Sequence, residues 1–591
     1  MSVVIGQHDD PYEPSRWGRR ARLALLGLGA VAFVWLVVST VLVVQAKREI
    51  DAGIARLEEA REDLSPGDLV RGKGRAALAE AEAAFERAED SAGSPFLAPL
   101  KFVPLVGEQV RSVDAQTSAA ADVVAIGRQA MRDAELAFEE RPAAGAARIA
   151  LMEEIVRITT RAQRRLQDVD LGPDFFLVGP VGDARLDFAA RLKEVQGSLA
   201  DSEAAAAGFA EFLRGPRRYL VLAANNAEMR AGSGMWLSAG VLAVQDGTFS
   251  LGEMLPTGDL LLPPGAVPVG GEFADRWGWL GPTEDLRQLA TTPQFDVTAP
   301  LAVEMWRALT GESVDGVLVV DPITLQGLLA AEGPIDAGGV ALDAENVLQY
   351  VFLDQYRNAP FQDADQSARR DQLGAVARSA IDAFETRDWE PPTLVDELAP
   401  AGGGRHVLAW SANPTEQRGW EAAGIAGELD EDSLLVSLMN ISGNKLDQFM
   451  AVTGSIEVDT GGADTDVAVR LEIVNEAPFG EPAYVVGPHP RSGVAEGVYR
   501  GILAIDIPGA AFDLRWDGAE QLVAEGPDGP ARVVATTVQL ARGERRELTL
   551  RFRLPEGVSG LRVEPSAREP AIAWRSGAET WADDHAERVE W

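Results

Sequence analysis

The sequence predicts a protein of several parts: an N-terminal transmembrane helix, an α-helical stalk or bundle, an α/β sandwich core with a mixed sheet, and a C-terminal all-β immunoglobulin-like sandwich. Three observations predict this order. An uncharged apolar run comes before residue 47, an Ala-rich helical periodicity follows it, and the apolar spacing changes to two after about residue 446. At 591 residues with 46% hydrophobic content, the chain can form more than one packed core.

Residues 23–44 carry no charge and are mostly Leu, Val, Ala and Gly, so as one helix they would cross the hydrocarbon core of a bilayer. Four arginines precede this run, whereas the basic residues 47 and 48 beyond it are offset by acids at 49 and 51. The positive-inside rule then keeps a tail at 1–22 cytoplasmic and places the bulk of a single-pass membrane protein outside the cytoplasm. A cleaved signal peptide is the alternative, because residues 44–46 resemble a cleavage site.

Composition excludes several function classes. A formal net charge of -37 repels the phosphates of nucleic acids, so no nucleic acid partner is expected. The chain has no Cys, which excludes disulfides, thiol nucleophiles and thiolate metal sites. Its four His residues show no zinc-binding spacing, and neither a Gly-x-Ser-x-Gly nor a Walker motif occurs. We interpret each His as surface or core filler.

Residues 47–214 show apolar side chains at helical spacing, with Pro95, Pro99 and Pro104 between two of the expected helices. This pattern predicts an extracytoplasmic helical stalk or bundle. Its expected role is to hold the next domain away from the membrane or to form a homo-oligomer.

Strands and helices alternate in an α/β core domain expected at 215–439. The spacing predicts strands at 219–223, 235–244 and 248–251, the last two joined by a turn at Gln245, Asp246 and Gly247. A strand at 316–320 delivers Asp321 at its carboxyl end, and Asp321 followed by Pro322 suits the start of a helix. Another helix is expected around 365–384. Sites in such mixed sheets collect at strand ends.

Alternation with period two predicts a β-sandwich at 440–565, for example at Val467, Val469, Leu471 and Ile473. Residues 566–591 are acidic with isolated Trp residues, and we expect a partly ordered tail.

Several polar side chains that follow these strands suit phosphate chemistry. Arginine binds phosphate oxygens bidentately and stays charged, and Mg²⁺ takes carboxylate oxygens while sharing substrate phosphates. We therefore expect a pyrophosphate site with Mg²⁺ as cofactor, and with Asp321 and Glu228 as the metal ligands. The expected ligand-binding residues are Asn225, Asn226, Glu228, Arg230, Arg357, Arg369, Arg370 and Gln372.

Structural roles stay open for the same residues. Asp321 could act only as a helix N-cap, the side chains at 228 and 230 could pair with each other, and those at 225 and 226 could close a turn. Of the adjacent arginines at 369 and 370, at most one can face a given site.

Three segments resemble the actinobacterial domain of unknown function 4012 family. They are YLVLAANNAEMRAGSG at 219–234, the run from Val314 through Asp321 to Pro334, and NISGNKLD at 440–447. The resemblance covers most of residues 217–554, and it implies a single-pass exported protein.

A second resemblance is to the LytR-CpsA-Psr domain. Residues 317–335 resemble its strand and following helix, and ARRDQ at 368–372 resembles its later Arg-rich helix. Those proteins bind a polyprenyl pyrophosphate-linked glycan through arginines and Mg²⁺ and transfer the phosphoglycan to the cell wall. The resemblance implies a lipid-linked glycan or a cell-wall polymer as the partner. The Arg-x-Asp-Thr segment of that family has no counterpart after Asn226.

Two interpretations of cell-envelope polysaccharide assembly or attachment follow. In the first, the protein is a Mg²⁺-dependent phosphoglycan transferase, in which Arg230, Arg357 and Arg370 clamp the phosphates and an acceptor hydroxyl attacks. In the second, it is a non-catalytic envelope scaffold or adhesion protein that binds a polymer or a protein partner. The sequence leaves catalysis undecided between them.

Overall fold

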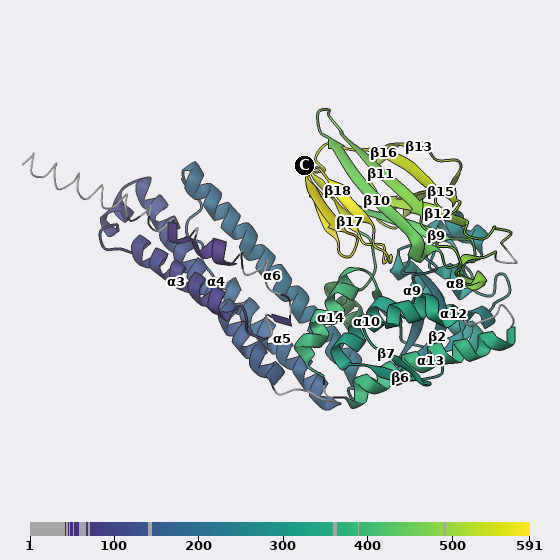
Figure 1. The fold of residues 1–591 in the computed structure, drawn as a ribbon. Coiled ribbons are helices and arrows are strands. Elements are labelled where there is room, and N and C mark those ends of the chain that lie inside the picture. Colours follow the sequence, from purple (N-terminus) through teal and green to yellow (C-terminus); the bar gives the residue numbers. More distant parts are fainter. Residues whose placement is uncertain are drawn as a thin grey trace, which may run out of the picture. The chain divides into compact units, whose positions relative to one another are not determined.

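The computed structural model describes residues 42, 45, 48–50, 52–57, 59, 65, 67–68, 71–139, 145–357, 363–387, 389–488 and 492–591, and it describes their side chains except at 363–373. The chain forms two compact units (Figure 1). The first contains the described residues up to 59 with Gly72–Asp133 and Arg161–Ser198. The second contains the described parts of Ser65–Arg71, Ala134–Thr160 and Leu199–Trp591.

The first unit is helical. It contains α3 (Arg75–Ala92), η1 (Ala98–Phe102), most of α4 (Val106–Glu139), the end of α5 (Ala146–Gln167) and the beginning of α6 (Gly179–Arg214). The small side chains of Ala81 and Ala120 let α3 and α4 approach closely, and Phe85 and Val124 fill the space between them. Phe188 of α6 packs against the same cluster.

The predicted fold class needs a correction at its N-terminus. No helix in the described residues is long and apolar enough to cross a membrane. Helices α3 to α6 contain 18 to 36 residues, but each carries charged side chains along its length. The transmembrane helix predicted at 23–44 lies outside the described residues except for Leu42. The described fold therefore consists of helices, mixed sheets and a C-terminal β-rich region.

The second unit begins with a mixed sheet in the order β3-β2-β1-β5-β8, with β4 paired to β2. The strands are β1 (Arg217–Asn225), β2 (Met235–Gln245), β3 (Thr248–Leu251), β4 (Leu255–Pro256), β5 (Gly316–Val320) and β8 (Val407–Ser411). β1 and β5 are parallel, and the other pairs are antiparallel. The predicted turn between β2 and β3 is confirmed, because Gln245 pairs with Thr248.

Helices and short elements cover both faces of this sheet. Near the face that carries Leu220 and Leu222 lie η2 (Thr257–Asp259), α7 (Gly271–Trp277), η3 (Gly278–Leu280), α8 (Leu286–Leu289) and α9 (Phe295–Thr310). The remaining elements of this region are α10 (Pro322–Glu332), β6 (Ile335–Ala337), β7 (Val340–Leu342), α11 (Val347–Gln349), η4 (Tyr350–Asp354), α12 (Gln355–Arg357), α13 (Asp363–Thr386), α14 (Pro391–Gly403) and α15 (Pro414–Ala422). Val221 and Met254 share the opposite core cluster with Phe212 of α6.

Two six-stranded sheets follow, in the orders β13-β16-β11-β10-β18-β19 and β14-β15-β12-β9-β17-β20. Their strands are β9 (Ser433–Asn440), β10 (Met450–Asp459), β11 (Thr465–Asn475), β12 (Tyr499–Ile507), β13 (Phe512–Asp517), β14 (Leu522–Asp528), β15 (Ala531–Leu540), β16 (Arg545–Leu554), β17 (Gly560–Glu564), β18 (Ala573–Ser576), β19 (Glu579–Ala582) and β20 (Glu587–Glu590). The short helices η5 (Asp447–Phe449) and α16 (Ala483–Val486) lie in their connections.

The sheet that contains β9 and β12 is buried on both faces. Leu503 and Ile505 of β12 point into the core of the sandwich, whereas Ile502 and Ala504 belong to the core that β1 and α9 share. Every residue of β9 is buried, which is typical of a strand covered on both sides. The mixed-sheet region and the sandwich are therefore packed on one common middle sheet.

Two sequence expectations differ from this arrangement. β9 begins at Ser433, inside the range expected for the α/β domain, because its apolar residues serve both cores. The expected tail at 566–591 contains β18, β19 and β20, which extend both sheets of the sandwich. Its tryptophans are not isolated, since Trp574 and Trp581 stack with ring centroids 6.2 Å apart.

A pair of carboxyl groups is buried where the middle sheet meets α7 and α9. Asp528 accepts hydrogen bonds from Arg276 Nη2 at 3.0 Å and from Thr292 Oγ1 at 2.7 Å. Asp506 on β12 is also buried, and no hydrogen bond to its side-chain oxygens is found within the described part of the chain. Burial and the neighbouring carboxylate of Asp528 raise the pKa of Asp506 well above its ordinary value.

This raised pKa predicts that wild-type stability falls as pH rises. Folded Asp506 keeps a proton that the unfolded chain releases above pH ~4, which costs about 1.4 kcal/mol per pH unit until the folded pKa is reached. Asp506→Asn does not titrate and keeps almost the same side-chain shape. Urea unfolding should therefore show the variant gaining stability relative to wild type between pH 5 and pH 8. The same difference in unfolding free energy at both pH values would contradict this assignment.

Candidate functional site

The segment after β1 interlocks with the segment after β9. Asn440 N donates to Met229 O at 3.1 Å, and Met229 N donates to Asp447 Oδ2 at 3.1 Å. Arg230 Nη1 donates to Asn440 O at 2.7 Å. Two of the three segments that carry the family resemblance are therefore in direct contact.

Asp447 is the centre of this contact. Besides Met229 N, its carboxylate accepts hydrogen bonds from Asn440 Nδ2 at 2.8 Å and Tyr499 Oη at 3.0 Å. Arg568 Nη1 lies 3.6 Å from Asp447 Oδ1, and both side chains are fully buried. Burial raises the pKa of Asp447, although these donors and the Arg568 cation oppose that shift.

Arg230 is held by backbone and amide oxygens. Its guanidinium donates to the carbonyls of Arg287, Met229 and Asn440 and to Gln288 Oε1, over 2.7 to 3.2 Å. Within the described part of the chain it forms no ion pair, and burial lowers its pKa to about 10. Arg230 therefore remains a buried cation at neutral pH.

Glu228 pairs with Lys445 and not with Arg230. The ammonium group of Lys445 lies over the rings of Tyr356 and Tyr484, with centroid distances of 5.0 and 5.5 Å. Burial lowers the pKa of Lys445 to about 7. The Glu228 carboxylate is thus already bound to a cation of the chain.

Asp321 is the N-cap of α10, which is the structural role considered for it in the sequence analysis. Its Oδ1 accepts from Ile323 N at 3.0 Å and Thr324 N at 3.1 Å. Its Oδ2 accepts from Asn226 Nδ2 at 2.7 Å and lies 2.5 Å from His406 Nδ1. Burial lowers the pKa of His406, but the Asp321 carboxylate raises it, and the net shift is upward.

The other expected residues lie apart from this group. Asn225 Oδ1 accepts a hydrogen bond from Ala227 N at 2.9 Å, which closes a turn. Arg357 is half exposed and pairs with Asp354 at 2.7 Å. The side chains of Arg369, Arg370 and Gln372 lie outside the described residues. Among the residues whose side chains are described, no group of three or more His, Asp or Glu is placed to hold a metal ion.

A polar cavity of about 500 Å³ opens beside the interlocked segments. Residues within 228–238, 256–258, 280–288 and 440–443 line it, together with Tyr484, Ser492 and Arg500. Three arginine side chains face it. Arg287 is paired with Asp285, whereas Arg230 and Arg500 form no ion pair with any described carboxylate. The buried Nε–H of Arg500 has no hydrogen-bond acceptor among the described residues. The described lining also includes the carboxylate of Glu228, which is paired with Lys445, so the cavity wall carries three arginines against one acid.

An apolar cavity of about 180 Å³ lies under the opposite face of the mixed sheet. Its walls come from β1, β2, β5, α10 and α13, and they include Leu242, Leu318, Leu325, Ala377 and Ile381. These side chains are aliphatic, so the cavity suits a hydrocarbon group.

The two cavities share Leu237 and Ser238 as lining residues. Ala223 pairs with Ser238 and Ala224 pairs with Trp236, which leaves Leu237 as the extra residue of a β-bulge. A bulge bends its strand and re-aims the side chains beside it. This irregularity of β2 thus lies where the polar and apolar cavities adjoin.

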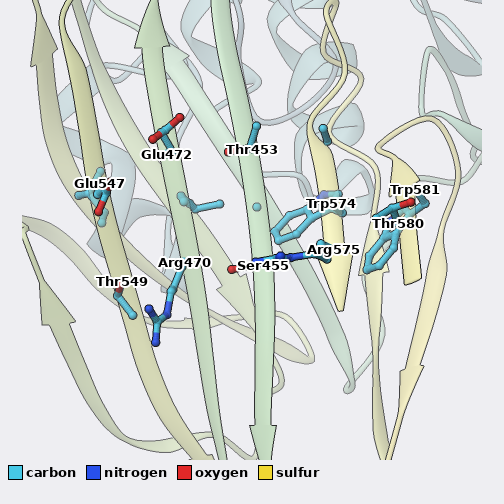
Figure 2. Close-up of a pocket in the computed structure, with 14 residues that line it drawn as sticks. Thr453, Ser455, Arg470, Glu472, Glu547, Thr549, Trp574, Arg575, Thr580 and Trp581 are labelled. Atoms are coloured by element: carbon cyan, nitrogen blue, oxygen red, sulfur yellow. The ribbon is translucent and has the colours of Figure 1, made fainter. Parts of the chain in front are cut away.

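A third hollow, of about 570 Å³, lies on the outer sheet of the sandwich (Figure 2). The pairing of five strands places one row of polar residues across it. This row consists of Thr549, Arg470, Ser455, Arg575 and Thr580. At the usual strand spacing the row extends about 19 Å. Such a row can donate to and accept from the hydroxyl groups of an extended polymer.

Residues 214–356 match a family model described as protein of unknown function, DUF4012. This match supports the resemblance to the DUF4012 family that the sequence segments indicated. The matched segment contains β1, β2 and β5, and with them Leu237 and Ser238, which line both cavities. No curated protein matches the chain.

Sequence reasoning missed several residues of this region. Lys445 and Asp447 stand in the quoted NISGNKLD segment, but no local signal shows that they meet residues about 220 positions earlier. His406 was interpreted as filler, and only the fold places it against Asp321. Arg500 could have been noticed as an Arg between apolar strand residues.

Removing the Asp447 carboxylate should destabilise the protein strongly. Asp447→Ala leaves the buried guanidinium of Arg568 without a counter-ion, and breaking such a pair costs about 3–5 kcal/mol. Asp466→Ala on the exposed surface of β11 is the matched control and should change stability by no more than about 0.5 kcal/mol. Urea unfolding measures both. Equal effects of the two substitutions would show that Asp447 does not anchor the contact.

Proposed function

We propose that the protein binds a phosphate-bearing, lipid-linked glycan and acts in the assembly or attachment of cell-envelope polysaccharide. One observation carries this proposal: a cationic cavity and an aliphatic cavity adjoin at Leu237 and Ser238. A polyprenyl pyrophosphate-linked glycan has a matching division into an anionic head and a hydrocarbon tail. The proposed complex places the pyrophosphate beside Arg230 and Arg500 and the first part of the tail among the aliphatic residues.

The charge of the polar cavity supports binding of an anion. The planar guanidinium groups of Arg230 and Arg500 suit phosphate oxygens, and neither forms an ion pair with a described carboxylate. Mg²⁺ usually keeps several waters and shares phosphate oxygens. In the proposed complex, Mg²⁺ therefore arrives with the pyrophosphate. An exported location and self-association through the helical unit stay predictions.

Calorimetric titration with a short polyprenyl pyrophosphate, with and without Mg²⁺, tests the proposal. Arg500→Gln should weaken binding about 10- to 100-fold, because a hydrogen bond to a charged group contributes about 1.5–3 kcal/mol. Arg515→Gln on the exposed surface of β13 is the matched control and should bind as wild type does. Ala377→Phe, which fills the aliphatic cavity, should weaken binding of the polyprenyl compound and leave inorganic pyrophosphate binding unchanged.

The proposal fails if the intact wild-type protein does not bind the polyprenyl pyrophosphate. It also fails if Arg500→Gln and Arg515→Gln bind equally well.

A second candidate function is that of a non-catalytic scaffold that holds an envelope polymer. The polar row across the outer sheet of the sandwich favours it, because five side chains at regular strand spacing match an extended chain of sugar hydroxyls. Arg575 stands in this row between Ser455 and Thr580 (Figure 2).

Arg575→Ala tests this second candidate. It should lower retention of the protein on immobilised cell-wall polysaccharide several-fold, whereas Arg515→Ala on the neighbouring surface should not. Binding of polyprenyl pyrophosphate should be the same in both variants, since neither residue lines the adjoining cavities. Equal retention of the two variants would exclude the row as a polymer site.

A further inference from the structure

Exposed apolar side chains gather on two connections of the helical unit. Nine of the seventeen exposed large apolar residues in the described chain lie within 96–106, between α3 and α4, or within 175–186, between α5 and α6 and at the beginning of α6. Phe102 and Phe176 are 88% and 74% exposed. Monomeric proteins rarely display such a group without a binding role.

One side chain joins the two connections. Gln109 Nε2 donates to Leu105 O at 3.1 Å and to Phe176 O at 2.6 Å. Gln109 Oε1 accepts from Val178 N at 2.9 Å. All three bonds go to the backbone of exposed apolar residues. The two connections are therefore held side by side at the beginning of α4.

The backbone of both connections is strained at an apolar residue. Leu105 has φ 68° and Phe176 has φ 56°, in the left-handed region that bulky side chains seldom adopt. Both of these residues are bonded to Gln109 and both point their side chains into solvent. Strain of this kind persists where the surrounding structure enforces it, and it is typical of functional segments.

The lack of unpaired charge among the projecting side chains favours a lipid surface over a protein surface. Residues 96–106 contain one charged side chain, Lys101, which pairs with Asp114 at 2.5 Å, and residues 175–182 contain none. The acids of the second connection, at 168, 170 and 174, come before Phe175. The exposed apolar side chains can therefore enter a lipid layer without burying an unpaired charge. The most exposed of these side chains line none of the three hollows described above. Projecting aromatic groups of this kind can enter the boundary between headgroups and acyl chains.

We propose that these two connections dock the helical unit onto the interfacial layer of a lipid bilayer, with Phe102 and Phe176 as the inserted side chains. The proposal deepens the function proposed above, since a lipid-linked ligand has to be reached in a membrane. It stands on separate residues, however, and plain phospholipid vesicles test it without that ligand.

The chain has no Cys, so single labels can be placed cleanly. Phe102→Cys and Phe176→Cys each carry a nitrobenzoxadiazole fluorophore in the full chain, and Phe479→Cys is the control, because Phe479 is 85% exposed but belongs to the second unit. On vesicles of phosphatidylcholine and phosphatidylglycerol, emission at 102 and 176 should rise several-fold and be quenched by nitroxide-labelled lipids. Emission at 479 should not change.

Unchanged emission at 102 and 176 would overturn the proposal, even if the protein sediments with the vesicles. An equal rise at all three positions would overturn it as well, because it would show adsorption without selectivity. A rise at 102 and 176 that depends on protein concentration and not on lipid would assign the surface to a second copy of the chain.

The role of the Gln109 contacts is tested with the label at 176. Gln109→Ala should reduce the emission increase on vesicles several-fold, because Phe176 is no longer held beside Leu105. Gln116→Ala, which removes only a contact with Ser112 on the same helix, should leave the increase unchanged. Equal signals in these two variants would show that the connections do not insert as a joined pair.

Discussion

A buried carboxylate fixes the arrangement of the second unit. Asp447 has no contact with solvent, so its charge has to be met by donors inside the protein. Those donors are Met229 N after β1, Asn440 at the end of β9 and Tyr499 on β12, and the guanidinium of Arg568 after β17 is the counter-ion. The interactions of the Asp447 carboxylate therefore set the relative positions of segments from different parts of the sequence. They also fix the position of Arg230, which follows Met229 and lines the polar cavity.

The doubly buried middle sheet adds a second constraint on the same region. Because β9 and β12 supply side chains to two cores at once, the mixed sheet and the sandwich cannot shift against each other without exposing apolar surface. The polar cavity lies at this junction, with walls from both regions. A ligand bound there would contact a preformed cavity and not a hinge, which lowers the ordering cost of binding.

Local sequence signals predicted much of the fold. Asp321 followed by Pro322 predicted the N-cap of α10, and the turn at Asp246 and Gly247 predicted the pairing of β2 with β3. The candidate site was harder, because Glu228 meets Lys445 and Asp321 meets His406 only through the fold. Periodicity reports the face on which a residue lies but not its distant partner. The strands within 566–591 escaped notice for the same reason, since β18 pairs with β10, more than a hundred residues earlier.

The long sequence separations of these contacts bear on the order in which the protein folds. During synthesis, Asp447 and Met229 are available long before Arg568, which follows Asp447 by 121 residues, and Ala567, which follows Asn226 by 341. Until those late residues emerge, a carboxylate and an asparagine amide destined for the interior lack their partners. The segment around Ala567 and Arg568 therefore completes the core of the second unit last. Contacts between residues so far apart in the sequence form slowly, so we expect this step to be slow. A chaperone that keeps residues 215–565 from aggregating would act during this interval.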